Sequence, residues 1–202
     1  MDLGQQRRVL ISEIAIAFPV AIALWCGVYF GLPPLAGMEE PVARLVLAVK
    51  CGALAALFCL VTGIEAVAHE RLASPAIDPL SDYVTRRLRI NQQYLQNTLE
   101  QLIVFAAGLL GLAVYCADGA AIRAVPAVTA VWIAARAAFW IGYHKGSLHR
   151  AAGAPGVMQS LLVLLYVSAR FGYEIAGWAG VAAILILFGG IEAFLVRATR
   201  MR

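Results

Sequence analysis

The chain has 202 residues, of which 62% are hydrophobic and 14% charged, and its mean hydropathy is +0.80. A soluble domain carries roughly a quarter charged residues, so this composition indicates an integral membrane protein and excludes an ordinary soluble domain. The net charge of +4 does not indicate nucleic-acid binding, because the basic residues lie between apolar stretches instead of in one soluble patch. No repeat, linker or low-complexity stretch divides the chain, so we expect a single membrane domain over residues 1–202.

Six apolar segments follow one another, and most have about the 20 residues that a membrane-spanning helix needs. They cover residues 9–30, 45–67, 95–116, 122–143, 156–171 and 178–196. The first is too long for the core of a secretion signal and lacks a small-residue cleavage site, so we interpret it as a retained span. The pattern predicts an all-α membrane protein with six spans.

Positive charge recurs at every second connection between these segments, which predicts the orientation in the membrane. The basic residues of these connections and ends are Arg7, Arg8, Arg71, Arg86, Arg87, Arg89, Lys145, Arg150, Arg197, Arg200 and Arg202. Basic loops stay in the cytoplasm, so both termini are expected there. A five-span arrangement would place the basic C-terminal tail outside, which favours six spans. The short loops and the lack of a targeting segment lead us to expect a bacterial inner membrane.

The connection from His69 to Arg89 is the only long one expected in the cytoplasm, and it contains turn and helix-cap residues. Ser81 or Asp82 is predicted to cap a helix that begins before the membrane and continues through Asn91 into the third span.

Asn97 and Glu100 are three residues apart near the start of the third span, so they share one helical face. One interpretation is a polar pair that joins two helices, with Glu100 meeting an arginine such as Arg136. The other is a pair that holds a polar ligand entering from the cytoplasm. An ionisable residue within a span is a functional hypothesis by default, and both interpretations stay open.

Arg136, Tyr143 and Arg150 are spaced seven residues apart. If one helix continues through all three, they line one face and drift by only about 20° per step. An arginine inside a membrane helix is costly unless it faces protein, water or an anionic partner. This face is therefore a candidate binding wall for a negatively charged ligand.

The remaining reactive or aromatic residues have simpler interpretations. The four cysteines lie in apolar stretches without C-x-x-C spacing, which is typical of core packing. His144 and His149 lack further ligands at metal-binding spacing, so no metal site is expected. The tryptophans, Trp25, Trp132, Trp140 and Trp178, are expected to face lipid or to lie at the membrane interface.

The order of Asn97-x-x-Glu100, then Arg136 with Gly142-Tyr143, then Arg150 resembles the membrane-associated proteins in eicosanoid and glutathione metabolism, the MAPEG family. The spacing is similar to that of the glutathione-conjugating leukotriene synthase branch. The resemblance covers roughly residues 69–167, and its second motif is the more specific. It implies a four-helix protomer that forms a homotrimer, with glutathione bound between neighbouring protomers at the cytoplasmic side.

By this resemblance the four-helix core would cover residues 43–172. Residues 1–42 would add a span before the core, and residues 173–202 would add a span and a basic tail after it. The protein would contact membrane lipid, a hydrophobic small-molecule substrate or lipid, and no nucleic acid.

The resemblance also implies a role for each site residue. Asn97 and Glu100 would contact the glutathione backbone, Arg136 and Tyr143 would hold its charged and amide groups, and Arg150 would lie beside the sulfur. A free thiol has a pKa of about 8.5, and a fixed guanidinium nearby favours the thiolate, which is the nucleophile.

Other positions match the family less closely. Arg71 occupies the region where the family places basic residues at the end of its first core helix. Gln93 stands in the glutathione-binding position where active relatives usually have an arginine, Gln96 where some have another, and Phe139 where the leukotriene synthase branch has a tyrosine. Glutamine supplies no charge for a carboxylate.

Three functions follow from these observations. The first is a glutathione-dependent transferase or peroxidase that acts on hydrophobic electrophiles dissolved in the bilayer. The second is a lipid-binding scaffold of the same fold without catalysis. The third is a small-molecule transporter in which Arg136 and Glu100 line a path, but the sequence lacks the inverted repeats typical of such proteins.

Overall fold

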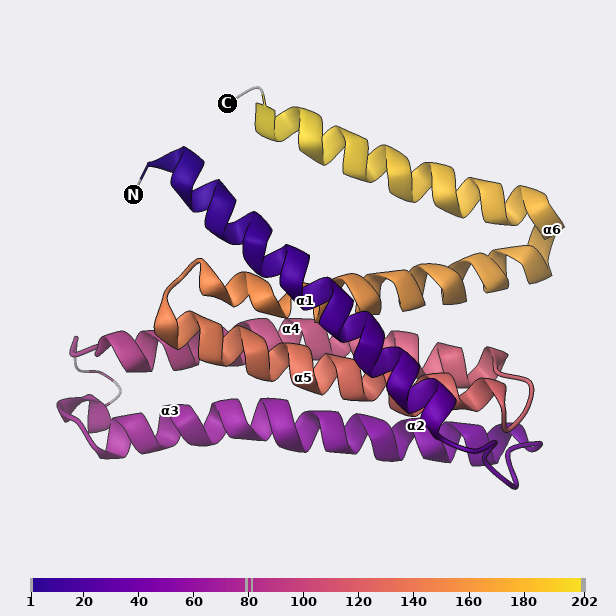
Figure 1. The fold of residues 1–202 in the computed structure, drawn as a ribbon, viewed down its shortest axis with the longest axis horizontal. Coiled ribbons are helices and arrows are strands. Elements are labelled where there is room, and N and C mark those ends of the chain that lie inside the picture. Colours follow the sequence, from indigo (N-terminus) through magenta and orange to yellow (C-terminus); the bar gives the residue numbers. More distant parts are fainter. Residues whose placement is uncertain (1, 79, 81, 201–202) are drawn as a thin grey trace.

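The computed structural model of the protein describes residues 2–78, 80 and 82–200. Every regular element in this part of the chain is a helix, and five helices are long and apolar enough to cross a membrane (Figure 1). Large apolar side chains are exposed along all of them, as lipid contact requires. The predicted all-α membrane fold is confirmed.

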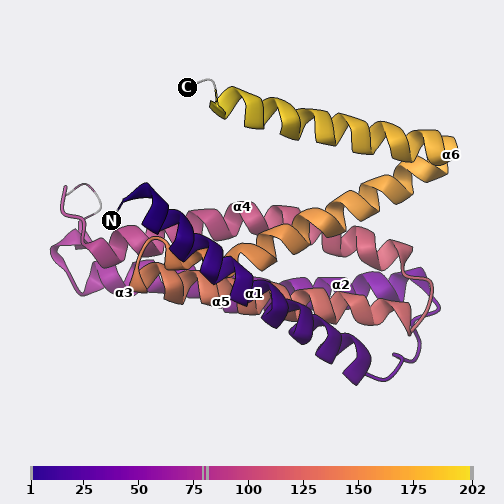
Figure 2. The ribbon, with the colours of Figure 1, turned by 45° about the horizontal axis from the view of Figure 1, so that its top comes forward.

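The N-terminal helix α1 (Leu3–Gly31) lies on the outside of the bundle. Its start is fixed by Asp2, whose carboxylate accepts a hydrogen bond from the backbone N–H of Gln5 at 2.7 Å. No residue of α1 is buried, and Figures 1 and 2 show it crossing the other helices obliquely. This helix therefore packs against the bundle without being part of its core.

The second apolar segment forms one rod of three consecutive elements: α2 (Pro41–Ala55), a π-helical turn η1 (Ala56–Val61) and α3 (Thr62–Leu72). A π-turn leaves the usual hydrogen-bond pattern of an α-helix. Here the Cys59 carbonyl accepts a hydrogen bond from the buried Tyr94 hydroxyl at 3.1 Å. The irregular turn thus connects this rod to the next helix.

The next helix, α4 (Arg86–Tyr115), begins later than predicted. Thr85 is its cap, because the Thr85 hydroxyl oxygen accepts from Leu88 N–H at 2.9 Å. The same hydroxyl donates to Glu70 at 3.1 Å, which anchors the start of α4 to the end of α3. The predicted cap at Asp82 is wrong because Asp82 lies in irregular chain, and Ser81 lies outside the described residues.

The hydrophobic core lies between α2, α4 and α5 (Ala124–Lys145). Trp132 is 0% exposed at its centre and stacks on Phe105 with ring centroids 4.7 Å apart. The expectation that Trp132 faces lipid is therefore wrong. Three of the cysteines, Cys51, Cys59 and Cys116, are buried and unpaired, which confirms their predicted packing role.

Two short segments, the 3-10 turns η2 (Pro75–Ile77) and η3 (Ala121–Arg123), lie in the connections. Near η3, buried Arg44 donates to three backbone carbonyls, those of Met38, Glu39 and Ala117, at 3.0–3.2 Å. One guanidinium thus ties two short loops together at this end of the bundle.

The last two predicted segments belong to one long helix, α6 (Ala154–Arg200), which bends sharply. Ala176 and Gly177 leave the helical conformation, and Gly177 has φ +58°, a conformation that favours glycine. The two arms, residues 154–175 and 178–200, run in opposite directions in Figure 1. The count of six separate spans stays a prediction, because five long helices are found.

The two arms of α6 approach closely at Gly172 and Gly180. A Cβ at Gly180 would collide with the backbone carbonyl of Gly172, so only glycine fits there. This bend places the C-terminus at the same end of the molecule as the N-terminus (Figure 1). The side of the membrane on which that end lies stays a prediction.

We expect Gly180→Leu to push the two arms of α6 apart, because its side chain would occupy the space of the Gly172 backbone. The separation should rise toward the about 8–10 Å between axes of ordinarily packed helices. The measurement is the spin–spin distance between labels introduced through non-canonical amino acids at Leu162 and Ile191, both exposed. Gly189→Leu is the control, because a Cβ there meets nothing within 4 Å. Equal distances in both variants would contradict the close approach.

Candidate functional site

A polar cavity of about 450 Å³ lies near the end of the bundle that holds the termini. Its polar side chains are Gln93, Asn97, Gln101, Tyr143 and Arg150. Four of these were predicted site residues, and Gln101 was missed. We call this space the polar cavity.

Helix α4 supplies one row of this lining. Gln93, Asn97 and Gln101 are each four residues apart, so their side chains lie one above the other on successive turns. The residues of this face are therefore four positions apart. The sequence prediction had instead used Asn97 and Glu100, which are three positions apart. Gln101 could have been found by continuing the four-residue spacing by one turn.

Arg150 reaches the cavity by a route other than the predicted one. Helix α5 ends at Lys145, and Arg150 lies in the following 3-10 turn η4 (His149–Gly153), so the three residues spaced by seven do not share one helix. The chain folds back over α5 at Gly142. This is possible because Gly142 lacks a side chain: a Cβ at this position would collide with the His149 carbonyl. As a result, the Arg150 guanidinium carbon lies 5.6 Å from the centre of the Tyr143 ring.

Arg136 lies behind the cavity and does not line it. It is 1% exposed and donates to Asn97 Oδ1 at 2.9 Å and to Thr98 Oγ1 at 2.7 Å. Its guanidinium also lies over the Phe139 ring, 4.4 Å from the ring centre. Because the Asn97 oxygen is engaged by Arg136, the NH₂ group of Asn97 is the part left to donate to a ligand.

Two predicted site residues lie elsewhere. Glu100 is exposed and accepts a hydrogen bond from Gln96 at 3.2 Å, so the proposed pairing of Glu100 with Arg136 is wrong. A step of three residues turns the Glu100 side chain about 60° from that of Asn97 around the helix axis. Arg71 lies in the last turn of α3 and does not line the polar cavity.

Helix α1 forms a wall of the cavity that the sequence analysis did not predict. Leu10 and Ile14 line it, and the intervening Glu13 carboxylate lies 2.6 Å from His149 Nδ1. His149 precedes Arg150, so this contact ties α1 to the turn that carries the arginine. Glu13 is the one charged residue within residues 9–30, and such a residue was the available signal.

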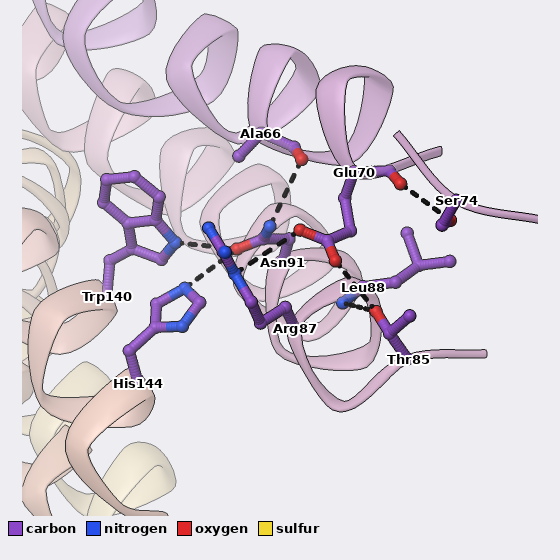
Figure 3. Close-up of polar contacts among 9 residues, drawn as sticks. All are labelled: Ala66, Glu70, Ser74, Thr85, Arg87, Leu88, Asn91, Trp140 and His144. Atoms are coloured by element: carbon purple, nitrogen blue, oxygen red, sulfur yellow. Dashed lines mark hydrogen bonds and ion pairs between the residues drawn. The ribbon is translucent and has the colours of Figure 1, made fainter. Parts of the chain in front are cut away.

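A second polar cluster joins α3, α4 and α5 near the same end (Figure 3). Buried Asn91 accepts from Trp140 Nε1 at 3.0 Å, lies 3.0 Å from His144 Nε2, and donates to the Ala66 carbonyl at 3.2 Å. Trp140 therefore has a hydrogen-bonding role between helices that the sequence analysis did not predict. Because both ends of the Asn91 amide are engaged, we interpret this cluster as a brace between helices.

Glu70 extends this brace to the connection before α4. Its carboxylate lies 3.4 Å from Arg87 Nε and also accepts from Thr85 (Figure 3). Over the described residues, no group of three or more His, Cys, Asp and Glu side chains is arranged to hold a metal ion.

We expect Thr98→Val to lower the free energy of unfolding by about 1–3 kcal/mol, because buried Arg136 would lose one of its two hydrogen-bond partners. The Arg136 Nε already has no partner, so no spare bond compensates for the loss. Thr129→Val is the control, since the buried Thr129 hydroxyl donates to the Val125 carbonyl of its own helix and bonds the Cys51 thiol instead of a guanidinium. Unfolding in a titration with denaturing detergent measures both. Equal losses would contradict the importance of the Arg136 contact.

The comparisons with known proteins give one match. A sequence profile of the MAPEG family matches residues 45–173, which is more than half of the chain. No curated protein and no solved structure matched this chain. The match runs from α2 to the first arm of α6 and includes Asn97, Arg136, Tyr143 and Arg150, so the chain belongs to the MAPEG family, an integral membrane family that includes glutathione transferases and peroxidases.

Proposed function

We propose that this protein is a glutathione-dependent transferase or peroxidase that acts on hydrophobic electrophiles dissolved in the bilayer. The observation that carries the proposal is the polar cavity, in which Arg150 and Tyr143 face the α4 row of Gln93, Asn97 and Gln101. The cavity volume is within the range of about 300–1,000 Å³ of small-molecule sites.

The chemistry of the lining fits an anionic thiol peptide. Arg150 is the cation of the lining, and among the described residues no carboxylate pairs with it. The amides of Asn97, Gln93 and Gln101 and the Tyr143 hydroxyl supply neutral donors and acceptors. Glutathione carries two carboxylates, peptide groups and an ammonium, which these groups are suited to bind.

When bound, glutathione supplies a thiol that reacts as the thiolate. The chain's contribution is the fixed positive charge of Arg150, which favours the charged form of a thiol beside it. Tyr143 holds that guanidinium against its ring, and Arg136 holds Asn97 for the peptide. The protein's own thiols are unsuited to this role. Cys51, Cys59 and Cys116 are buried, so a substrate cannot reach their thiols.

We also propose that the protein is a homotrimer in a membrane, with both termini in the cytoplasm and glutathione between neighbouring protomers. The positions of Glu100 and Arg71 support this arrangement. Neither lines the polar cavity of its own chain, and each would be available to the cavity of a neighbouring protomer. A bacterial inner membrane is the proposed location.

We expect Arg150→Ala to abolish the ultraviolet thiolate absorbance that appears when glutathione is titrated into the detergent-purified protein. The fixed charge that favours the thiolate would be lost, so the apparent pKa of bound glutathione should return to about 8.5. Arg150→Lys is the matched variant. It keeps the charge but not the planar group over Tyr143, so part of the absorbance should remain. A saturable signal of wild-type size in Arg150→Ala would refute this role for Arg150. Lipid binding without any thiolate signal in the wild type would favour the scaffold function.

We expect Gln93→Arg to bind glutathione about tenfold more tightly, because a charge-assisted hydrogen bond contributes about 1.5–3 kcal/mol. Gln93 lines the polar cavity, so its replacement would add a second cation to the lining. Gln96→Arg is the control on the same helix, since Gln96 does not line the cavity and bonds Glu100 instead. Isothermal titration measures both affinities. Tighter binding in both variants alike would indicate a general charge effect and contradict the assignment of Gln93.

A further inference from the structure

Glu13 is an acidic residue in the otherwise apolar part of α1. It is the one charged residue within residues 9–30, and it lies about 15 Å from the start of the helix at 1.5 Å per residue. A charge at such a position is costly unless it faces protein, water or a partner. The Glu13 side chain is 29% exposed, and its carboxylate lies 2.6 Å from His149 Nδ1. This partner therefore lowers the cost of keeping the carboxylate in α1.

The contact between Glu13 and His149 is a directional one. An ionised carboxylate only accepts hydrogen bonds, so His149 Nδ1 carries the hydrogen and donates it. A separation as short as 2.6 Å indicates a charge-assisted hydrogen bond, which is roughly twice as strong as a neutral one. Such a bond fixes the orientation of the His149 ring relative to α1.

His149 is also held by the chain around it. Its backbone N–H donates to the Gly146 carbonyl at 3.0 Å, and its own carbonyl packs on Gly142. The ring lies against Gly146, where a Cβ would come within 3.2 Å of the ring atom Cδ2. Of these contacts, the one with Glu13 comes from a part of the chain distant in sequence. Glu13 therefore sets how the start of η4 is placed relative to the rest of the polar cavity.

Arg150 directly follows His149, and its side chain has few other constraints. Its guanidinium lies over the Tyr143 ring, and among the described residues no hydrogen bond or ion pair to this guanidinium is found. Arg136, in contrast, is held by two hydrogen bonds. The direction of the Arg150 side chain therefore depends on the backbone that carries it, which the contact between Glu13 and His149 holds in place.

The residues beside Glu13 connect the same stretch of α1 to the polar cavity. Leu10 and Ile14 both line the cavity, and Glu13 lies between them in sequence. This part of α1 thus supplies both a wall of the cavity and the carboxylate that contacts the turn carrying Arg150. Helix α1 lies outside residues 45–173, which match the family, so the contact is supplied by a segment outside that match.

We propose that Glu13 is a positioning residue, which through His149 holds Arg150 in the orientation that places its guanidinium beside the thiol of bound glutathione. The role toward glutathione rests on the proposed function, whereas the effect of Glu13 on Arg150 does not. Glu13 touches neither the substrate nor the reacting atoms in this scheme. It determines how strongly the site favours the thiolate, because the effect of a charge on a thiol depends on the distance between them.

The first test needs no glutathione. The ¹⁵N relaxation of the Arg150 Nε–H group in the full protein in detergent gives an order parameter, which measures how firmly this group is held. The order parameter should fall in Glu13→Ala. Glu13→Gln should restore most of it, because the glutamine oxygen can still accept from His149 Nδ1. His149→Ala should cause the same fall, and the double variant should add nothing, since both changes remove one contact.

Two controls accompany this measurement. Glu192→Ala removes the same kind of carboxylate from the exposed second arm of α6, and it should leave the Arg150 order parameter at the wild-type value. The Nε–H group of buried Arg136 is the internal reference in every variant. An unchanged order parameter for Arg150 in Glu13→Ala, or an equal fall in Glu192→Ala, would overturn the proposal. A fall that Arg136 shares would indicate general loosening of the bundle and would overturn it as well.

The second test measures the thiolate absorbance of bound glutathione against pH. Glu13→Ala should raise the apparent pKa of the bound thiol toward about 8.5, because Arg150 is no longer held beside it. Loss of a nearby negative charge would by itself lower this pKa, so a rise distinguishes positioning from a direct charge effect. Glu13→Gln, which keeps the contact without the charge, should leave the pKa at or below the wild-type value.

The two tests separate this inference from the proposed function. An apparent pKa that is unchanged or lower in Glu13→Ala would overturn the role of Glu13 toward glutathione. A wild-type protein without any thiolate signal would refute the proposed transferase. In that case a fall in the Arg150 order parameter that is confined to Glu13→Ala and His149→Ala would still support the positioning of Arg150 by Glu13.

Discussion

The buried charge of Arg136 is the constraint on which the α4 wall of the polar cavity depends. A guanidinium that is 1% exposed inside an apolar bundle must find its partners within the protein. It takes them from two consecutive residues of α4, Asn97 and Thr98, and from the faces of the Tyr94 and Phe139 rings. These contacts fix the rotation and the height of α4 against α5. The same rotation turns the row that begins at Gln93 toward the polar cavity.

The opposite wall depends on how the chain leaves α5. A continuous helix through Arg150 would have carried that side chain away from the bundle, by about 1.5 Å per residue. Instead, the returning chain packs against Gly142, which has no side chain. The Glu13 carboxylate of α1 contacts the His149 side chain of this returning segment. The polar cavity is thus assembled from α1, α4, α5, η4 and the start of α6, so its walls come from several segments of the chain. A change in how α1 packs should therefore change the position of Arg150.

Much of this organisation could be predicted from the sequence, because lipid exposure imposes a strong hydrophobic pattern. The all-α membrane fold, the burial of Cys51, Cys59 and Cys116 and the family were predicted correctly, and the motif positions Asn97, Tyr143 and Arg150 lie in one cavity. Spacing alone could not tell whether the helix continued past Lys145, because the reversal depends on a tertiary contact at Gly142. Spacing also could not tell whether Glu100 or Thr98 is the partner of Arg136, because the two residues lie less than one helical turn apart on α4.

The bend in α6 has a consequence for how the protein enters its membrane. Because the chain doubles back at Gly177, it finishes at the end where it starts. With that end in the cytoplasm, the insertion machinery has to move across only two short connections, residues 32–40 and 116–120, and the bend itself. The first turn of α4, which carries Arg86, Arg87 and Arg89, never has to cross the bilayer, and neither does Arg150 of the candidate site.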